Sequence, residues 1–428
     1  MTKYPTYKDS GIEWLGQIPT HWEMLKAKYM FQKNKREVQD GDKVITCFRD
    51  GQVTLRENRR TTGFTESITE IGYQGIRKGD LVIHQMDAFA GAIGVSDADG
   101  KGTSVYHCCT PKGEYLTYYY AHVIREMALK GYIQSLYRGI RERSSDFNYV
   151  TFGNCLLPVP SPSEQRQIVA YLDYKSNKIN ERICQREREL QTISELKQAE
   201  IATVVTRGLV PNVPMKESGI EWLGKIPAHW NVKRIASVSH EINDSNVTME
   251  YTQPSQFKFG EIVLKSIIGE GEYDENIKKC TLFKKNDILI NGLNLNYDFV
   301  TQRVAKSNYD GIITPAYIVI RVKDGLSADY AMFLFKSIDN KKIFNGWGTG
   351  IRLTLSYKEL KKQCIPIPPK EEQDAIVAYL QSRITFIDNY IAKLKEEINY
   401  LQEYKQRLIS DVVTGKVDVR GVEIPNEE

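Results

Sequence analysis

The residues best suited to chemistry are lysines and arginines that lie among aromatic side chains in two stretches, 26–157 and 234–365. Fixed positive charges neutralise phosphates, and arginine can also read a base edge through paired hydrogen bonds. These cations permit a nucleic-acid partner but do not by themselves indicate one. The candidates in the first stretch are Arg56, Arg59, Arg60, Arg77, Lys78, Arg138, Arg141 and Arg143. Those in the second stretch are Lys258, Lys265, Lys278, Lys279, Lys284, Lys285, Arg303 and Arg352.

One short motif stands out among these candidates, because Gly-Ile-Arg occurs at 139–141 and again at 350–352. Glycine allows a backbone to approach a partner closely, and arginine pairs with phosphate. For any single cation, a solvated surface charge is the simpler interpretation. The repeated motif is therefore the best single candidate for a phosphate contact.

The sequence offers little that could catalyse a reaction. Residues 219–225 resemble a phosphate-binding loop, but Ile226 stands where serine or threonine is needed. His107, Cys108 and Cys109 are adjacent, whereas zinc ligands are separated by two to four residues. We therefore expect a non-catalytic chain that holds no metal and no cofactor.

Composition is that of an ordinary protein with more than one domain. The chain has 428 residues, of which 41% are hydrophobic, and a net charge of +4. We expect no membrane span and no secretion signal, and the seven cysteines show no paired spacing. These features predict a cytoplasmic protein with reduced thiols.

The elements that position the cations follow from an internal repeat of 208 residues. The segment at 10–22 returns at 218–230 with eleven of thirteen positions identical, and Pro-x-Pro with Glu-Gln returns at 158–165 and 366–373. Between these shared ends the two middles look unrelated. This division predicts that the shared ends of the two halves have one function in common, whereas the middles have functions that differ.

Each half closes with a long amphipathic helix. Apolar residues recur at heptad spacing in both, which predicts a coiled coil, although Ser176, Arg186 and Lys197 interrupt the first helix. The predicted seam comprises Leu172, Ile179, Ile183, Leu190 and Ile193 in the first helix, and Leu380, Ile384, Ile387, Ile391, Leu394, Ile398, Leu401 and Leu408 in the second.

Local sequence also predicts where these helices begin and end. Ser161, Pro162 and Glu164 form a capping box, and Gly208 and Gly415 follow the last turns. The connection 208–215 between the first helix and the second domain is short, and a compact domain usually begins and ends near the same point. The second helix should therefore start near the end of the first and run antiparallel to it. In the middles, 79–83 and 286–290 predict corresponding strands. The predicted fold is α+β: two similar domains, two long antiparallel helices and pseudo-twofold symmetry.

The repeated SGIEWLG-x-IP-x-HW segment, the Pro-x-Pro and Glu-Gln entry to each helix, and the closing VVTGKVDVR resemble the specificity subunits of type I restriction-modification systems. The resemblance covers the whole chain. It implies a target-recognition domain at 1–157, a central helix at 158–208, a second recognition domain at 209–365, and a C-terminal helix and tail at 366–428.

The resemblance also implies function and partners. Each recognition domain would read one half of a bipartite, asymmetric site in double-stranded DNA, and the helix pair would set the spacer. Two methyltransferase subunits would dock on the shared elements, and restriction subunits would complete the complex. S-adenosylmethionine, ATP and Mg²⁺ would then belong to these partner subunits. The alternatives are a subunit of a modification-only system and a two-headed protein-binding scaffold that touches no nucleic acid.

Overall fold

The computed structural model describes residues 2–59, 72–136, 147–258, 260–265, 274–297 and 302–425. Within these ranges the chain forms two compact units, one made of Met1–Arg186 with Glu397–Glu428, the other of Glu187–Glu396. The division passes through both long helices. Each unit therefore contains one α+β domain, the start of one long helix and the end of the other, and the predicted fold class is confirmed.

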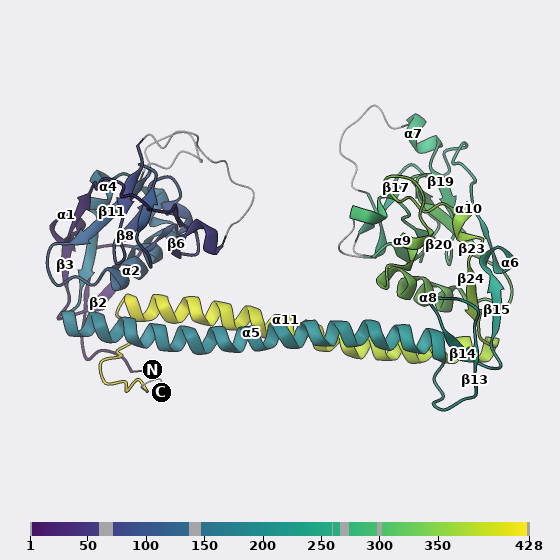
Figure 1. Ribbon diagram of the computed structural model, residues 1–428. Coiled ribbons are helices and arrows are strands. Elements are labelled where there is room, and N and C mark those ends of the chain that lie inside the picture. The colour runs from purple at the N-terminus through teal and green to yellow at the C-terminus, as the bar shows by residue number, and fades with distance from the viewer. Residues whose placement is uncertain are drawn as a thin grey trace. The chain divides into compact units, whose positions relative to one another are not determined.

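The first unit is built around an antiparallel sheet of order β4-β11-β8-β9. Helix α2 packs on β9 beside the long helices, and smaller two-stranded ribbons complete the domain (Figure 1). The strands are β1 (Tyr7–Asp9), β2 (Gln17–Pro19), β3 (Glu23–Lys26), β4 (Phe31–Asn34), β5 (Ile45–Cys47), β6 (Val53–Leu55), β7 (Gln74–Ile76), β8 (Leu81–His84), β9 (Ile93–Val95), β10 (Gly100–Gly102), β11 (Tyr106–Pro111) and β12 (Leu156–Val159). The short helices are α1 (Ala27–Met30), η1 (Arg56–Asn58), η2 (Ala88–Ala90), α2 (Thr117–Leu129), α3 (Tyr132–Ser135) and α4 (Tyr149–Asn154).

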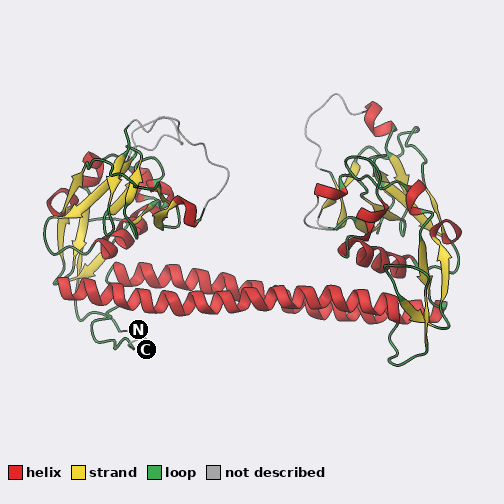
Figure 2. Cartoon of the chain, in the orientation of Figure 1, coloured by secondary structure: helices red, strands yellow, loops and turns green. Residues whose placement is uncertain are grey.

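The second unit repeats this plan with a sheet of order β16-β23-β20-β21, on which α8 packs. It adds a four-stranded sheet of order β18-β17-β22-β19, in which β17 and β22 are parallel. Figure 2 shows strands together with short helices in each unit. The strands are β13 (Met215–Glu217), β14 (Lys225–Pro227), β15 (Asn231–Arg234), β16 (Ser239–Glu241), β17 (Pro254–Lys258), β18 (Glu261–Leu264), β19 (Thr281–Phe283), β20 (Ile288–Ile290), β21 (Val304–Lys306), β22 (Gly311–Ile313), β23 (Ile318–Val322) and β24 (Cys364–Ile367). The short helices are α6 (Ile235–Val238), α7 (Asp274–Lys278), η3 (Leu295–Tyr297), α8 (Ala328–Asn340), α9 (Ile343–Trp347) and α10 (Tyr357–Leu360).

The predicted corresponding strands are both present as β8 and β20. Each is entered through a residue with positive φ, Gly79 at 89° and Asn286 at 73°. The carboxylates that follow, Asp80 and Asp287, accept hydrogen bonds from backbone amides three residues earlier, at 2.9 and 2.7 Å. The turn chemistry of the two copies is therefore the same, although the surrounding sequences differ.

The long helices are α5 (Pro162–Arg207), with 46 residues, and α11 (Lys370–Val413), with 44. The backbone N–H of Glu164 donates to Ser161 Oγ at 3.3 Å, and Gly208 and Gly415 have φ of 78° and 75°. These observations confirm the predicted helix ends. One detail differs, because the Glu164 carboxylate does not serve the capping box and instead bonds residues of the N-terminal segment.

The two long helices lie side by side and antiparallel in each unit (Figure 1). All thirteen predicted seam residues are buried or half-buried. In the first unit, Leu172 and Leu408 belong to one buried cluster, and in the second Leu380 packs with Val204 and Val205. The helix pair therefore continues the core of each domain. Among the described residues, no helix combines the length and the apolar run that crossing a membrane requires.

Candidate nucleic-acid interface

A buried carboxylate joins the N-terminal segment of the first unit to the start of α5. Glu164 accepts hydrogen bonds from Tyr4 Oη at 2.6 Å and lies 3.0 Å from His21 Nε2. Trp22, the neighbour of that histidine, is fully buried. The repeated His-Trp pair and the Glu of the helix entry are therefore parts of one contact.

The second unit repeats this contact at the start of α11. His229 Nε2 lies 2.9 Å from Glu372, and the indole N–H of the buried Trp230 donates to the same carboxylate. Of the two carboxylates, the Glu164 side chain is 2% exposed and that of Glu372 is 34% exposed. The same residue types thus form this contact in both units, but the carboxylate of the second unit is more exposed to solvent.

The glutamine that follows each glutamate holds a loop against the helix. Gln165 Oε1 accepts from the backbone N–H of Leu116 at 2.8 Å, and its amide donates to the carbonyl of Pro160 at 3.0 Å. In the second unit Gln373 binds the backbone N–H of Ser327 at 2.7 Å in the same way. The repeated Glu-Gln dipeptide therefore secures the domain to the helix N-terminus through both side chains.

A buried tyrosine binds the C-terminal end of each long helix. Tyr119 Oη donates to the carbonyl of Val413 at 3.0 Å, and Tyr330 Oη donates to that of Val205 at 2.9 Å. Burial raises the pKa of both phenols well above 10, so both remain neutral donors. Each domain is thereby held to the start of one long helix and the end of the other. We call this set of repeated contacts the frame.

Two of the polar interruptions in the first helix form ion pairs across the helix pair. Arg186 Nε lies 2.9 Å from Glu397, and Lys197 Nζ lies 2.6 Å from Asp388. These side chains therefore do not separate the helices. They replace apolar contacts with partly exposed charge pairs, which contribute little stability.

The candidate cations of the first unit differ in availability. Arg59 pairs with Asp50 at 2.7 Å, and its guanidinium lies 4.3 Å from the centroid of the Phe48 ring. Arg56 is half-buried at the start of the short helix η1, and Lys78 is exposed on a turn. Arg77 is different, because its guanidinium bonds Asp42 and the carbonyl of Gly100, both at 3.1 Å. The remaining candidates, Arg60, Arg138, Arg141 and Arg143, lie outside the described residues.

Arg303 of the second unit is a correction to the sequence prediction. It is 6% exposed, and its guanidinium donates to the carbonyls of Asn291, Leu293 and Asn294 at 2.6–3.1 Å. A guanidinium buried in this way holds a loop together and cannot reach a phosphate. The same argument applies in weaker form to Arg77. Both guanidiniums are engaged in hydrogen bonds within their own unit.

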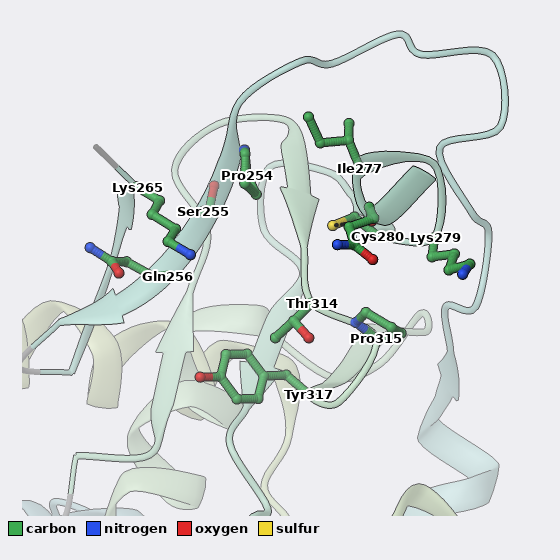
Figure 3. Close-up of a pocket in the computed structure, with 11 residues that line it drawn as sticks. Pro254, Ser255, Gln256, Lys265, Ile277, Lys279, Cys280, Thr314, Pro315 and Tyr317 are labelled. Atoms are coloured by element: carbon green, nitrogen blue, oxygen red, sulfur yellow. Dashed lines mark hydrogen bonds between the residues drawn. The ribbon is translucent and has the colours of Figure 1, made fainter. Parts of the chain in front are cut away.

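Two lysines predicted separately line one pocket of about 640 Å³, Lys265 beside β18 and Lys279 after α7. Figure 3 shows them on different walls, with Tyr317 and Thr314 between them. All eleven lining residues belong to the described part of the chain and include no carboxylate. The polar groups that sequence reasoning missed are Ser255, Gln256, Asn276, Thr314 and Tyr317.

The other lysines of the second unit do not line this pocket. Lys258, Lys278, Lys284 and Lys285 are exposed. Arg352 is also exposed and follows Ile351 at the tip of a hairpin closed by Thr349 and Thr354. The repeated Gly-Ile-Arg motif singled out Arg352 among the candidates, but nothing in the sequence around Arg303 indicated that its guanidinium is buried.

The comparisons with known proteins agree with this architecture. Residues 227–400 match the family described as the type I restriction modification DNA specificity domain. The chain is 22% identical to a putative type I restriction enzyme MjaX specificity subunit of Methanocaldococcus jannaschii, over 95% of this chain and 96% of that protein. It is 25% identical to the MjaVIII specificity subunit of the same organism, over 63% of this chain and 64% of that protein.

Two solved structures share the fold. One comes from a study of complex assembly and conformational transition of the type I R-M system, with a TM-score of 0.68 and 16% identity over 94% of this chain and 99% of that chain. The other is the HsdS subunit from Thermoanaerobacter tengcongensis, with a TM-score of 0.51 and 17% identity over 94% of this chain and 98% of that chain. The chain is therefore similar along nearly its whole length to type I restriction-modification specificity subunits, and its residues 227–400 match their DNA specificity domain.

Proposed function

We propose that this chain is the DNA-reading subunit of a type I restriction-modification complex, and that its two recognition domains read the two halves of a bipartite, asymmetric site. The observation that carries the proposal is the frame, which recurs with the same chemistry at His21–Glu164 and His229–Glu372 while the loops beyond it differ. A frame that is the same in both units, with loops that differ, suits one duplex whose two half-sites differ in sequence.

The chemistry of the second unit supports a nucleic-acid partner. Lys265 and Lys279 line a pocket that also presents amides, a hydroxyl and the ring of Tyr317. Lysines provide affinity for phosphate, whereas amides and hydroxyls donate and accept at base edges. A lining with two cations and no carboxylate favours an anionic ligand over a neutral or basic one.

The helix pair would then serve as a spacer and as the docking site for two methyltransferase subunits. Helix α11 presents exposed rings at Tyr379, Phe386, Tyr390, Tyr400 and Tyr404. Aromatic side chains are enriched at protein–protein interfaces, which suits a protein partner along this helix. S-adenosylmethionine, ATP and Mg²⁺ would be held by the methyltransferase and restriction subunits.

A salt titration tests the DNA-binding proposal. The chain in complex with its methyltransferase partner should bind one two-part duplex, selected from a randomised library, with an affinity that falls steeply between about 50 and 200 mM salt. A scrambled duplex of the same length is the control. Binding that ignores both salt and sequence would favour the protein-binding scaffold instead.

A matched insertion tests the spacer. Glu189 accepts a hydrogen bond from Tyr390, so these residues face each other across the helix pair. Seven residues inserted after each would add about 10 Å of helix, which is about three base pairs at 3.4 Å each. The preferred spacer should lengthen by that amount while both half-sites persist, and an unchanged spacer would refute the ruler.

An exchange of residues 26–157 for the corresponding segment of another specificity subunit tests modularity. One half-site should change and the other should remain. A change in both half-sites would contradict the modular proposal.

A further inference from the structure

The hairpin tip at 349–354 presents an apolar side chain to solvent. Thr349 and Thr354 pair through two backbone hydrogen bonds of 3.0 and 2.9 Å, which close a narrow turn over Gly350, Ile351 and Arg352. The Ile351 side chain is 98% exposed. A single exposed apolar side chain is ordinary on a protein surface, so the groups that lie beside Ile351 decide what this tip can bind.

The tip lies beside a second exposed group from a distant part of the sequence. Asn296 Nδ2 donates to the carbonyl of Ile351 at 3.4 Å, and both Asn296 and its neighbour Tyr297 are exposed. The tyrosine is 69% exposed. Together Asn296, Tyr297, Ile351 and Arg352 form a cluster, which we call the tip cluster, with an amide, a phenol, an apolar side chain and a guanidinium.

The base of the tip is anchored firmly. Leu353 has φ of 40°, a strained value for leucine, and its carbonyl accepts from the backbone N–H of Leu295 at 3.0 Å. The backbone N–H of Leu355, which is 2% exposed, donates to the carbonyl of Gly292 at 2.9 Å. Strain persists only where surrounding contacts impose it, so the tip is held in one conformation before any ligand arrives.

We propose that the tip cluster enters the major groove of the half-site read by the second unit, where Ile351 contacts a thymine methyl group and Arg352 donates to a guanine. This inference rests on the proposed function and deepens it, because it assigns specificity to two adjacent residues. The major groove is about 12 Å wide and admits an α-helix or a two-stranded ribbon, which leaves room for the narrower turn at 349–354. The thymine methyl group is an apolar feature of that groove, and guanine presents the O6 and N7 acceptors that suit a guanidinium.

Alternative roles explain the cluster less well. Ile351 is 98% exposed and so adds nothing to the core, and Arg352 by its charge alone would attract phosphate without distinguishing bases. Lysine clusters elsewhere in the unit, such as Lys284 and Lys285, have no exposed apolar neighbour of this kind on the same turn. The pairing of the two side chains on a rigid turn is what indicates base reading.

A protein–DNA double-mutant cycle tests the inference. The probe is the two-part duplex selected by the wild-type chain with its methyltransferase partner. In separate duplexes, each thymine of the half-site is replaced by deoxyuridine, which removes the methyl group, and each guanine by 7-deazaguanine, which removes N7. Binding is compared for the wild-type chain, Ile351→Ala and Arg352→Ala, with Arg352→Lys to separate charge from bidentate geometry.

The wild-type chain should lose affinity about 5-fold or more at one thymine and at one guanine. Ile351→Ala should abolish the first sensitivity and Arg352→Ala the second, and Arg352→Lys should restore binding without restoring discrimination. Both side chains are exposed, so neither change should affect folding. Val247→Ala, which truncates a side chain that is 69% exposed, and Lys358→Ala are the matched controls in the same unit.

The outcomes separate the two proposals. If the wild-type complex selects a two-part site but both variants retain every base sensitivity, the tip inference is overturned while the DNA-reading function stands. If the wild-type complex selects no two-part site, the function itself fails. Sensitivity that changes in the other half-site would also overturn the assignment of this tip to the half-site read by the second unit.

Discussion

The two units hold their long helices with the same frame but protect it differently. In the first unit Tyr4 covers Glu164, which is 2% exposed, whereas in the second Glu372 is 34% exposed and takes a hydrogen bond from Trp230. The tryptophan indole of the first unit, Trp22, has no hydrogen-bond partner among the described residues. The duplicated sequence therefore reproduces the tryptophan packing and the glutamate in both units. The surrounding segments determine how far each carboxylate is exposed to solvent.

The outer parts of the two domains differ far more. The first unit uses the separate ribbons β5-β6 and β7-β10, whereas the second uses one mixed sheet of four strands. The first also places His122 where the matching helix position of the second holds Phe333, which is 7% exposed. Divergence is thus concentrated away from the frame, as expected if the frame serves a common partner and the outer parts serve different ones.

The largest effect is expected from removal of a frame tryptophan. Trp22→Ala and Trp230→Ala each delete a fully buried side chain, so each should lower the free energy of unfolding of its own unit by about 3–5 kcal/mol. Urea unfolding, combined with hydrogen exchange resolved to peptides, measures this. Val150→Ala, at a position that is 71% exposed, is the control. Equal weakening of both units by one change would show that the frame is not local.

The next effect concerns pH and distinguishes the units. Burial, followed by the charges of Arg125 and Lys405, lowers the pKa of His122 to about 4. Between pH 6.5 and 4 the unfolded chain binds a proton here that the folded chain does not. This group's contribution is therefore complete above pH 6.5 and is lost as pH falls towards 4, by up to about 3 kcal/mol.

The His122→Phe variant copies the residue of the second unit and should remove that dependence. The comparison of urea unfolding for the two proteins from pH 7.5 to 4 isolates this residue from the carboxylates, which titrate in both. Asp50 and Asp173 line the same cavity as His122 and remain present in both proteins. Parallel pH profiles would contradict the assigned cause.

A smaller difference should appear between the two frame carboxylates. Glu164→Gln removes a charge that is bonded to Tyr4 and His21 and shielded from water, which should cost about 2 kcal/mol. Glu372→Gln should cost less, because water can reach that position. Thermal and urea unfolding of the two variants give the comparison. Identical losses would mean that exposure does not control the strength of this contact.

The smallest effect is expected in the helix pair. Lys197→Leu replaces one member of an ion pair whose partner, Asp388, is 52% exposed, so stability should change by less than about 1 kcal/mol. The wild-type contribution should weaken as salt rises, and the variant should not show that change. A loss of several kcal/mol would identify Lys197 as an essential contact and not a tolerated interruption.

Much of the fold follows from local chemistry. Ser161 caps α5 and Gly208 ends it because these choices depend on neighbours within a few residues. The long helices were predictable because the heptad pattern repeats along the whole element. The strands β8 and β20 were predictable for a similar reason, since a turn residue and an apolar run suffice to mark them. The contacts of Glu164 were not, because Tyr4 lies 160 residues away in the sequence.

The candidate interface shows the opposite balance. Arginine has the same charge and length at 303 and 352, yet one guanidinium is buried among loop carbonyls and the other is exposed on a hairpin. Similarly, Arg186 looks like a defect in an apolar seam until Glu397 is seen to face it. The sequence alone determined the repeat, the two long helices, and where each helix begins and ends, because periodicity and capping depend on residues that are close in the sequence. Only the tertiary structure decided which cations are free to bind, because a side chain's availability depends on carbonyls and carboxylates that distant segments bring beside it.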